Sequence, residues 1–178
     1  MPLVFAEPKL EFDAFDADLS WKATADGLQV NLNKANFQNK DLAGEASGVW
    51  NELADGPGRI DLSARLSRAR GDAVWRYLPL VAGKFTQKWL HESLIRGTAS
   101  DTVLKLKGDL RQFPFRSRKG EKPGDSLFEV RGKLHDVTLR YAPDWPDIEA
   151  IEGDLLFAGE RMLITGKSGK VFGVALHD

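Results

Sequence analysis

The residues that could carry chemistry in this chain are few and widely separated. Its histidines are His91, His135 and His177, and the patterns HExxH, GxSxG and GxGxxG do not occur in the sequence. Cysteine is absent, which excludes thiol chemistry and disulfides. We therefore expect no enzyme activity, and we name no catalytic residue, metal site or cofactor.

Two short motifs resemble ligand sites but lack a required residue. The run 166–168 (Gly-Lys-Ser) is similar to the end of a phosphate-binding P-loop, but the glycine needed five residues earlier is Arg161. Asp16 and Asp18 have the spacing of the first ligands of a calcium loop, but the sixth position, which should be glycine, is Trp21. We interpret the first run as a hairpin turn and the two acids as the wet face of a strand.

Tryptophan offers one further possibility, since exposed indole rings in a β domain can stack on sugars. The simpler interpretation is that these side chains anchor the core and the sheet edges. Facing carboxylates from two strands would also serve glycoside hydrolysis. A carbohydrate-binding β domain therefore stays open as an alternative. The five tryptophans are Trp21, Trp50, Trp75, Trp89 and Trp145.

Composition limits the other classes of function. The 178 residues are enough for one ordinary domain, with 42% hydrophobic and 29% charged residues. Lysine and arginine total 25 against 26 acids, so there is no general electrostatic case for nucleic acid as a partner. No apolar run approaches the roughly 18 residues that span a bilayer. We expect the chain itself not to cross a membrane.

The dominant pattern is alternation of apolar and polar residues, which is typical of strands with one covered face. Residues 60–67 alternate strictly, as do 104–107 and 128–134. Across His135 and Asp136 the parity of the apolar residues reverses, and a β-bulge there would keep both halves on one face. About nine strands are expected, in a mainly β fold.

One segment, residues 72–97, has helical spacing instead. Asp72 is placed to cap a first short helix that Pro79 ends, and Gly97 is placed to stop a second one. The apolar positions Phe85, Trp89 and Leu94 should pack against one end of the sheet. Membrane insertion of this amphipathic helix is the alternative. The module 1–178 thus divides into strands (1–71), a helical insert (72–97) and strands (98–178).

A polar, mostly basic insert covers residues 116–124. Such composition is typical of a solvated hairpin loop. Contact with a lipid headgroup or another anionic surface is the functional alternative.

An ordered series of short motifs runs through most of the chain. It includes 75–79 (Trp-Arg-Tyr-Leu-Pro), 108–115 (Gly-Asp-Leu-Arg-Gln-Phe-Pro-Phe) and 141–146 (Tyr-Ala-Pro-Asp-Trp-Pro). In order and spacing this series resembles the YhdP branch of the AsmA-like proteins of Gram-negative bacteria, from about Asp72 to Val174. The resemblance implies an internal segment of a large envelope protein. That protein would be anchored in the inner membrane and carry a long β-groove across the periplasm, associated with phospholipid movement to the outer membrane.

Both lines of argument lead to one expectation. The fold should be an elongated, twisted antiparallel sheet bent into a groove, with a short helical element at one end and more apolar strand face than the helices can cover. Phospholipid acyl chains and neighbouring repeats of the same longer chain are the partners expected, and a protein-binding scaffold is the alternative. The candidate lipid-facing residues are Leu62, Leu66, Leu104, Leu106, Val130, Leu134, Leu139, Leu155 and Phe157.

Overall fold

The alternating segments form long strands in the computed structural model, which describes residues 5–7, 9–25, 27–115, 126–159 and 161–177. These residues contain nine strands, most of them longer than ten residues. The strands are β1 (Ala14–Thr24), β2 (Gly27–Gln38), β3 (Leu42–Asn51), β4 (Arg59–Arg70), β5 (Leu94–Asp109), β6 (Leu127–Leu139), β7 (Ile148–Ala158), β8 (Arg161–Val171) and β9 (Val174–His177).

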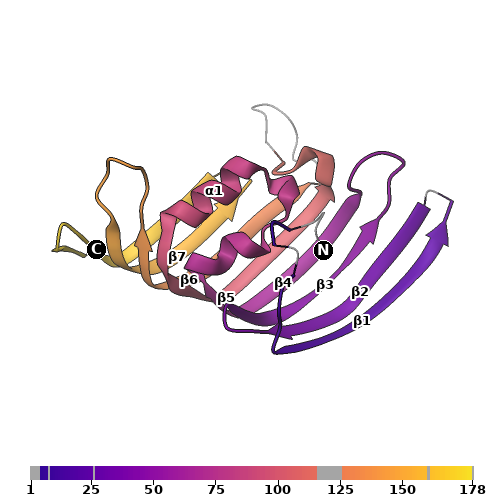
Figure 1. Ribbon diagram of the computed structural model, residues 1–178, viewed down its shortest axis with the longest axis horizontal. Coiled ribbons are helices and arrows are strands. Elements are labelled where there is room, and N and C mark those ends of the chain that lie inside the picture. The colour runs from indigo at the N-terminus through magenta and orange to yellow at the C-terminus, as the bar shows by residue number, and fades with distance from the viewer. Residues whose placement is uncertain (1–4, 8, 26, 116–125, 160, 178) are drawn as a thin grey trace.

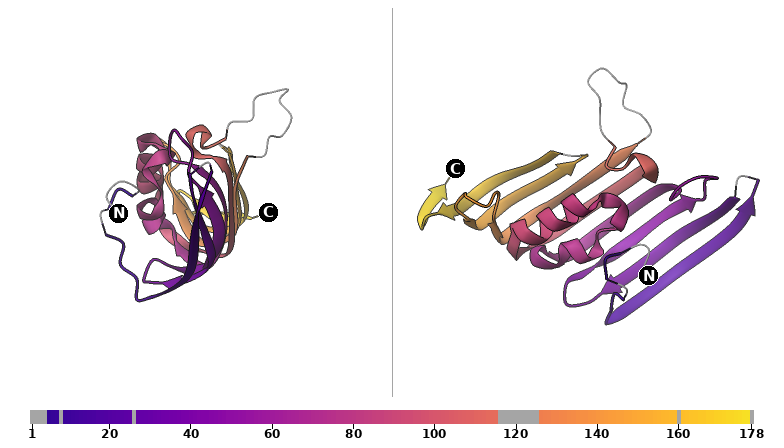
Figure 2. Two further views of the ribbon diagram at one scale, coloured as in Figure 1. Left: turned by 90° about the vertical axis from the view of Figure 1, so that its right-hand side faces the viewer. Right: turned by 45° about the horizontal axis from the view of Figure 1, so that its top comes forward.

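All nine strands belong to one sheet, and their order in space is their order in the sequence. Each pairs antiparallel with the next, from β1 to β9 (Figure 1). Seen end-on in Figure 2, the sheet curves around the side on which the helices lie. The predicted mainly β fold, a twisted and groove-like antiparallel sheet, is therefore confirmed.

The predicted β-bulge is present in β6. The register with β7 shifts between Leu134 and Val137, and Asp136 has a φ of 48°. Because one extra residue is taken up in the bulge, Leu134 and Val137 lie on the same face of the sheet, and both are buried.

The helical segment is shorter than predicted and begins with 3₁₀ turns. It comprises η1 (Gly71–Tyr77), η2 (Leu80–Ala82) and α1 (Lys84–Ser93), and a further 3₁₀ turn, η3 (Leu110–Gln112), follows β5. Asp72 does not cap the first helix, since it lies inside η1, where it accepts hydrogen bonds from Arg70. Pro79 does follow the end of η1, as predicted.

Gly97 was predicted to stop the second helix, and this was wrong. Helix α1 ends at Ser93, and Gly97 lies within β5 with a φ of 112°. A Cβ atom at this position would lie 2.5 Å from the Cα of Val137 on β6. The glycine is therefore required by the close approach of two strands.

The expected packing of α1 holds only in part. Phe85, in the first turn, is 82% exposed, so its predicted burial is wrong. Trp89 is half-buried, and Leu94 packs against the hydrophobic core. Helical spacing identified the apolar stripe, but the helix begins only at Lys84, so Phe85 extends beyond the surface that the sheet offers.

The hydrophobic core is small for a chain of this length. Its buried cluster consists of Leu134, Val137, Leu139 and Ile151, from β6 and β7. In Figure 1 the helices lie over this part of the sheet and leave β1–β3 uncovered. Stability is therefore concentrated under the helical segment.

Some predictions fall outside the described residues. The basic insert 116–124 does so completely. Asp26 and Glu160, which belong to two predicted turns, do so as well, although the strands that flank them pair as antiparallel hairpins.

Candidate functional site

A continuous row of apolar side chains crosses the sheet perpendicular to its strands. Each member is the direct register partner of the next, and the row passes through eight strands without a polar residue. With strands about 4.8 Å apart, the row is about 34 Å long. Its members, from β1 to β8, are Ala17, Ala35, Ala46, Ala64, Leu104, Val130, Phe157 and Met162.

Two further rows run beside it on the same face. One passes through six strands as Leu19, Leu32, Gly48, Leu62, Leu106 and Phe128. The other begins as Phe15, Phe37, Gly44 and Leu66 and reaches Thr102 on β5. We call the surface formed by these three rows the apolar face.

Two glycines of β3, Gly44 and Gly48, leave two positions near the middle of this face without a side chain. A Cβ atom at Gly48 would lie 2.4 Å from the carbonyl oxygen of Asp61 and 3.2 Å from Cδ1 of Leu62. One at Gly44 would be 2.8 Å from Cδ2 of Leu66. The leucines of β4 therefore lie over the glycines of β3, and a larger residue at either glycine would force the two strands apart.

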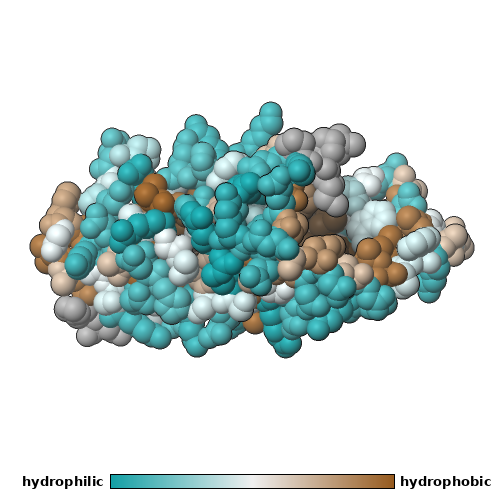
Figure 3. Space-filling model, turned by 60° about the horizontal axis from the view of Figure 1, so that its bottom comes forward, coloured by the Kyte–Doolittle hydropathy of each residue, from teal (hydrophilic) through white to brown (hydrophobic). Residues whose placement is uncertain are grey.

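The apolar face is exposed at its β1 end and half-buried over most of its other residues. Phe15 is 61% and Leu19 52% exposed, and Trp21, which follows on the same side of β1, is 72% exposed. Figure 3 shows a hollow in the right-hand half of the molecule, where β1–β4 lie in Figure 1, bordered by hydrophobic surface. Large apolar side chains on a curved sheet without their own cover indicate a binding surface.

The nine candidate residues all lie on this side of the sheet, six of them within the three rows, but they have two environments. Leu134 and Leu139 are 6% and 4% exposed in the core beneath the helices, which is not a surface that a ligand reaches in this conformation. The other seven are half-buried. Those seven are Leu62, Leu66, Leu104, Leu106, Val130, Leu155 and Phe157.

None of the nine predicted residues lies in the β1–β3 part of the face. Phe15, Ala17 and Leu19 alternate with acids, and Phe37 lies two residues after Ala35, so the period-two signal was available. A second bulge, between Leu32 and Ala35, breaks the alternation in β2 and hides its continuity from the sequence.

Polar contacts fasten the helical segment to the sheet at the β2–β3 turn. Arg76 on η1 donates to Asp41 (2.5 Å) and forms two hydrogen bonds of 2.7 Å with the carboxylate of Glu7. The Tyr77 hydroxyl also donates to Asp41, at 3.0 Å. Asn39 closes the turn by accepting from the backbone N–H groups of Asp41 and Leu42.

The charges of this contact reinforce one another. The hydrogen bond and positive charge of Arg76 hold the pKa of the Glu7 carboxyl below its usual range, while burial opposes that shift. Burial raises the pKa of the Tyr77 hydroxyl, which keeps it protonated and able to donate. We call this group of side chains the polar anchor.

The opposite face of the sheet is charged and wet. Ion pairs connect neighbouring strands there, with Lys107 Nζ 3.1 Å from Asp61 Oδ2 and Lys133 Nζ 2.7 Å from Asp101 Oδ2. Exposed pairs of this kind contribute at most about 1 kcal/mol each. These ion pairs mark this face as the solvated side of the sheet. An apolar ligand is therefore expected to bind only to the apolar face.

A hollow of about 1010 Å³ extends over β1–β5 beside the Phe15 row. Its lining includes the charged residues Asp16, Glu45 and Arg65, and the last two form an ion pair of 3.8 Å. Its lining also includes every member of the Phe15 row, from Phe15 to Thr102, so the hollow extends along one border of the apolar face.

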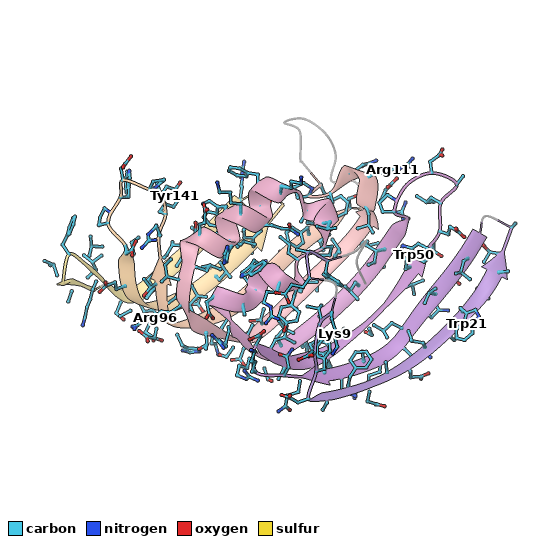
Figure 4. The ribbon with its side chains drawn as sticks, in the orientation of Figure 1. Lys9, Trp21, Trp50, Arg96, Arg111 and Tyr141 are labelled. Atoms are coloured by element: carbon cyan, nitrogen blue, oxygen red, sulfur yellow. The ribbon has the colours of Figure 1, made fainter. Side chains whose placement is uncertain are left out.

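The structure also bears on the carbohydrate alternative. Trp21 and Trp145 are strongly exposed, but Trp21 lies on β1 while Trp145 lies in the β6–β7 connection beside Tyr141, at the other side of the molecule (Figure 4). Trp50, Trp75 and Trp89 are half-buried. The five described tryptophans therefore do not gather in one cluster, although Trp21 and Trp50 both pair with Val30 and lie on the same face of the sheet.

Within the described residues, no group of three or more His, Asp and Glu side chains is arranged to hold a metal ion. None of the described helices is both long and apolar enough to cross a bilayer.

Known proteins resemble this chain in sequence. The profile of the family described as "YhdP protein" matches residues 1–178. A curated relative, "Intermembrane phospholipid transporter YhdP" of Escherichia coli (strain K12), is 28% identical over 160 residues. That match covers 89% of this chain and only 12% of the relative's length. No solved structure is significantly similar to it.

Proposed function

This chain belongs to the YhdP family, and on that premise we propose that its apolar face holds phospholipid acyl chains as one stretch of a longer lipid-conducting groove. The observation that carries the proposal is the uninterrupted apolar row from Ala17 to Met162, whose residues are half-buried except for the buried Ala35. The name of the curated relative supports phospholipid as the lipid class.

The mechanism of lipid binding is passive and needs no covalent step, so the apolar face acts as a binding surface. Acyl chains lie across the strands, where each methylene that leaves water contributes about 0.8 kcal/mol. The row is about 34 Å long, more than the roughly 15 Å acyl layer of one leaflet. A whole lipid therefore fits along this segment and can slide, because an apolar row has no polar group that would hold it at one position.

Headgroups stay at the wet rim of the groove, since burial of an unpaired charge is costly. Lipid contacts concentrate on the seven half-buried candidates and on the exposed residues of β1. Leu134 and Leu139 support the groove from beneath the helices.

The longer groove requires neighbours at the edge of the sheet. Strand β1 is the outermost strand on its side, and all its residues except Ala17 are exposed. An edge strand of 11 residues with free backbone groups is a template for another strand. We therefore propose that residues 1–178 form one module of a periplasmic protein, and that a neighbouring repeat of the same chain pairs with β1.

Photo-crosslinking tests the proposal. A photoreactive amino acid is placed at Leu62, Leu104 or Phe157 of the apolar face, or at the control positions Lys105 and Arg131 of the polar face. The protein is irradiated with phospholipid vesicles, and adducts are identified by mass spectrometry. Phospholipid adducts are expected at the first set only. Equal labelling of both faces would favour the alternative of a protein-binding scaffold.

A further inference from the structure

Three side chains on the polar face form a line of hydrogen bonds across β5, β6 and β7. The Ser100 hydroxyl lies 2.8 Å from Nε2 of His135, and Nδ1 of His135 lies 3.1 Å from Oε2 of Glu152. The other oxygen of Glu152 accepts the backbone N–H of Asp136, at 2.8 Å. A hydroxyl, an imidazole and a carboxylate in this order are the arrangement that activates a serine as a nucleophile.

Backbone irregularities on all three strands bring these residues into line. Each of the three is next to, or two residues from, a non-glycine residue with positive φ, namely Asp101 (48°), Asp136 (48°) and Ala150 (50°). The register shifts between Ser100 and Val103 in β5 and at matching places in the β6–β7 and β7–β8 pairs. Bulges re-aim side chains and are frequent beside active sites.

We propose that Ser100, His135 and Glu152 form a Ser–His–Glu relay, which gives the polar face an acyl-transfer activity towards small, unhindered carboxylic esters. This activity is independent of the lipid groove, because the three side chains lie on the opposite face of the sheet. Ser100 is the nucleophile and His135 the general base, and Glu152 is a positioning residue that acts through His135.

The first half of the reaction acylates the serine. With its proton on Nδ1, His135 donates to Glu152 and leaves Nε2 free to accept the Ser100 proton. The serine oxygen bonds to the ester carbonyl carbon and its proton passes to Nε2. The carbon–oxygen bond to the alcohol then breaks, and the alcohol leaves with the proton from Nε2.

Water completes the cycle. It attacks the acyl-serine carbonyl and gives a proton to Nε2, and the proton returns to the Ser100 oxygen as the carboxylic acid leaves. The sum is one ester and one water converted to one acid and one alcohol.

The surroundings suit a small and accessible substrate. Lys133 is the register partner of Ser100 on the same face, and its ammonium is held by the neighbouring Asp101, 2.7 Å from Oδ2. The side chains of His135 and Glu152 are each 46% exposed, so an ester reaches the relay directly from solvent.

The same hydrogen bonds also link the three strands, so loss of stability alone would not test the proposal. Reactivity is therefore measured with a fluorophosphonate probe, which loses fluoride when a nucleophilic serine attacks phosphorus, and with p-nitrophenyl acetate. The variants are Ser100→Ala, His135→Gln and Glu152→Gln. Ser63→Ala is the control, because Ser63 lies on the same face of β4 opposite Lys105.

The expected result is one phosphonyl group on Ser100, located by peptide mass mapping. Ester turnover should fall about 100-fold or more in Ser100→Ala and His135→Gln, the range lost with a general base. Glu152→Gln should lower kcat while leaving KM unchanged, with the same melting temperature. Ser63→Ala should react like the unchanged protein. Absence of label on Ser100, or equal turnover by Ser100→Ala, Ser63→Ala and the unchanged protein, would overturn the relay.

Discussion

Arg76 on η1 and Asp41 in the β2–β3 turn form an ion pair of 2.5 Å that joins the helical segment to the sheet, and the Asp41 side chain is 3% exposed. Removal of the arginine leaves that carboxylate buried without its main partner, which typically costs about 3–5 kcal/mol. We predict that Arg76→Ala lowers the free energy of unfolding by about 3 kcal/mol in urea titrations. The control Arg65→Ala breaks only an exposed pair with Glu45 and should change it by less than about 0.5 kcal/mol. Similar values for the two variants would mean that the polar anchor does not hold the helices.

Alanine substitutions at Leu134 and Leu62 should reduce the free energy of unfolding by different amounts, because the two leucines are packed to different extents. Leu134→Ala creates a cavity in the core and should cost about 2–5 kcal/mol. Leu62→Ala removes a half-buried side chain from the open part and should cost about 1 kcal/mol. Chemical denaturation measures both. Equal losses would indicate a face that is closed and packed throughout, which is incompatible with the proposed groove.

A charge in the middle of the apolar face should block lipid without unfolding the sheet. Leu106 stands between Leu62 and Phe128 in one row, and it is already half-exposed. Leu106→Asp should therefore weaken phospholipid binding at least about tenfold, or about 1.4 kcal/mol, as read from a fluorescent phospholipid.

The matched control for that variant is Val103→Asp. It introduces the same charge on the opposite, polar face of the sheet, where Val103 pairs with Arg131. Binding should survive in this control, and the melting temperatures of both variants should stay close to that of the unchanged protein. If both variants bind lipid equally well, the lipid does not occupy the apolar face.

The polar anchor should also make stability depend on pH. The pKa of Glu7 is lower in the folded chain than in the unfolded one, where a glutamate titrates near about 4.3. The unfolded state therefore takes up protons first as the pH falls. The contribution of Glu7 is fully present above that value and is lost as the pH falls through the folded-state pKa. The difference between the unchanged protein and Glu7→Gln in urea titrations should be present at pH 7 and should shrink as the pH falls below about 4.3 and through the folded-state pKa. A constant difference would exclude this linkage.

The sequence was sufficient to predict the strands and their apolar face, because side chains alternate sides along a strand whatever its partners are. The bulge at His135 and Asp136 was predictable for the same reason, since only an extra residue reconciles the two halves of β6. The end of α1 was not predictable in this way. A glycine at this distance after a helical stretch is typical of a helix end. The structure shows that Gly97 is needed for another reason, namely the close approach of Val137 on the next strand.

The register between the strands could not be predicted from the sequence either. Ser100, His135 and Glu152 come from three strands and have no common sequence motif, so their contact depends on pairings and bulges that one sequence does not encode locally. The difference in burial between Leu134, which is buried, and Leu104, which is half-buried, could not be predicted either. Both are leucines on the same alternating face, and they differ only in whether the helices cover them.

The order of the strands has a consequence for how such a chain acquires its structure. Every strand pairs only with its neighbours along the chain, so the sheet can grow by one hairpin at a time, each closing a short loop. Sheets with distant pairings fold slowly because long loops must close before any contact forms. A chain of this topology can therefore fold progressively from its N-terminus. Each new strand would find its partner already in place, and the helical segment would settle once β6 and β7 complete the surface beneath it.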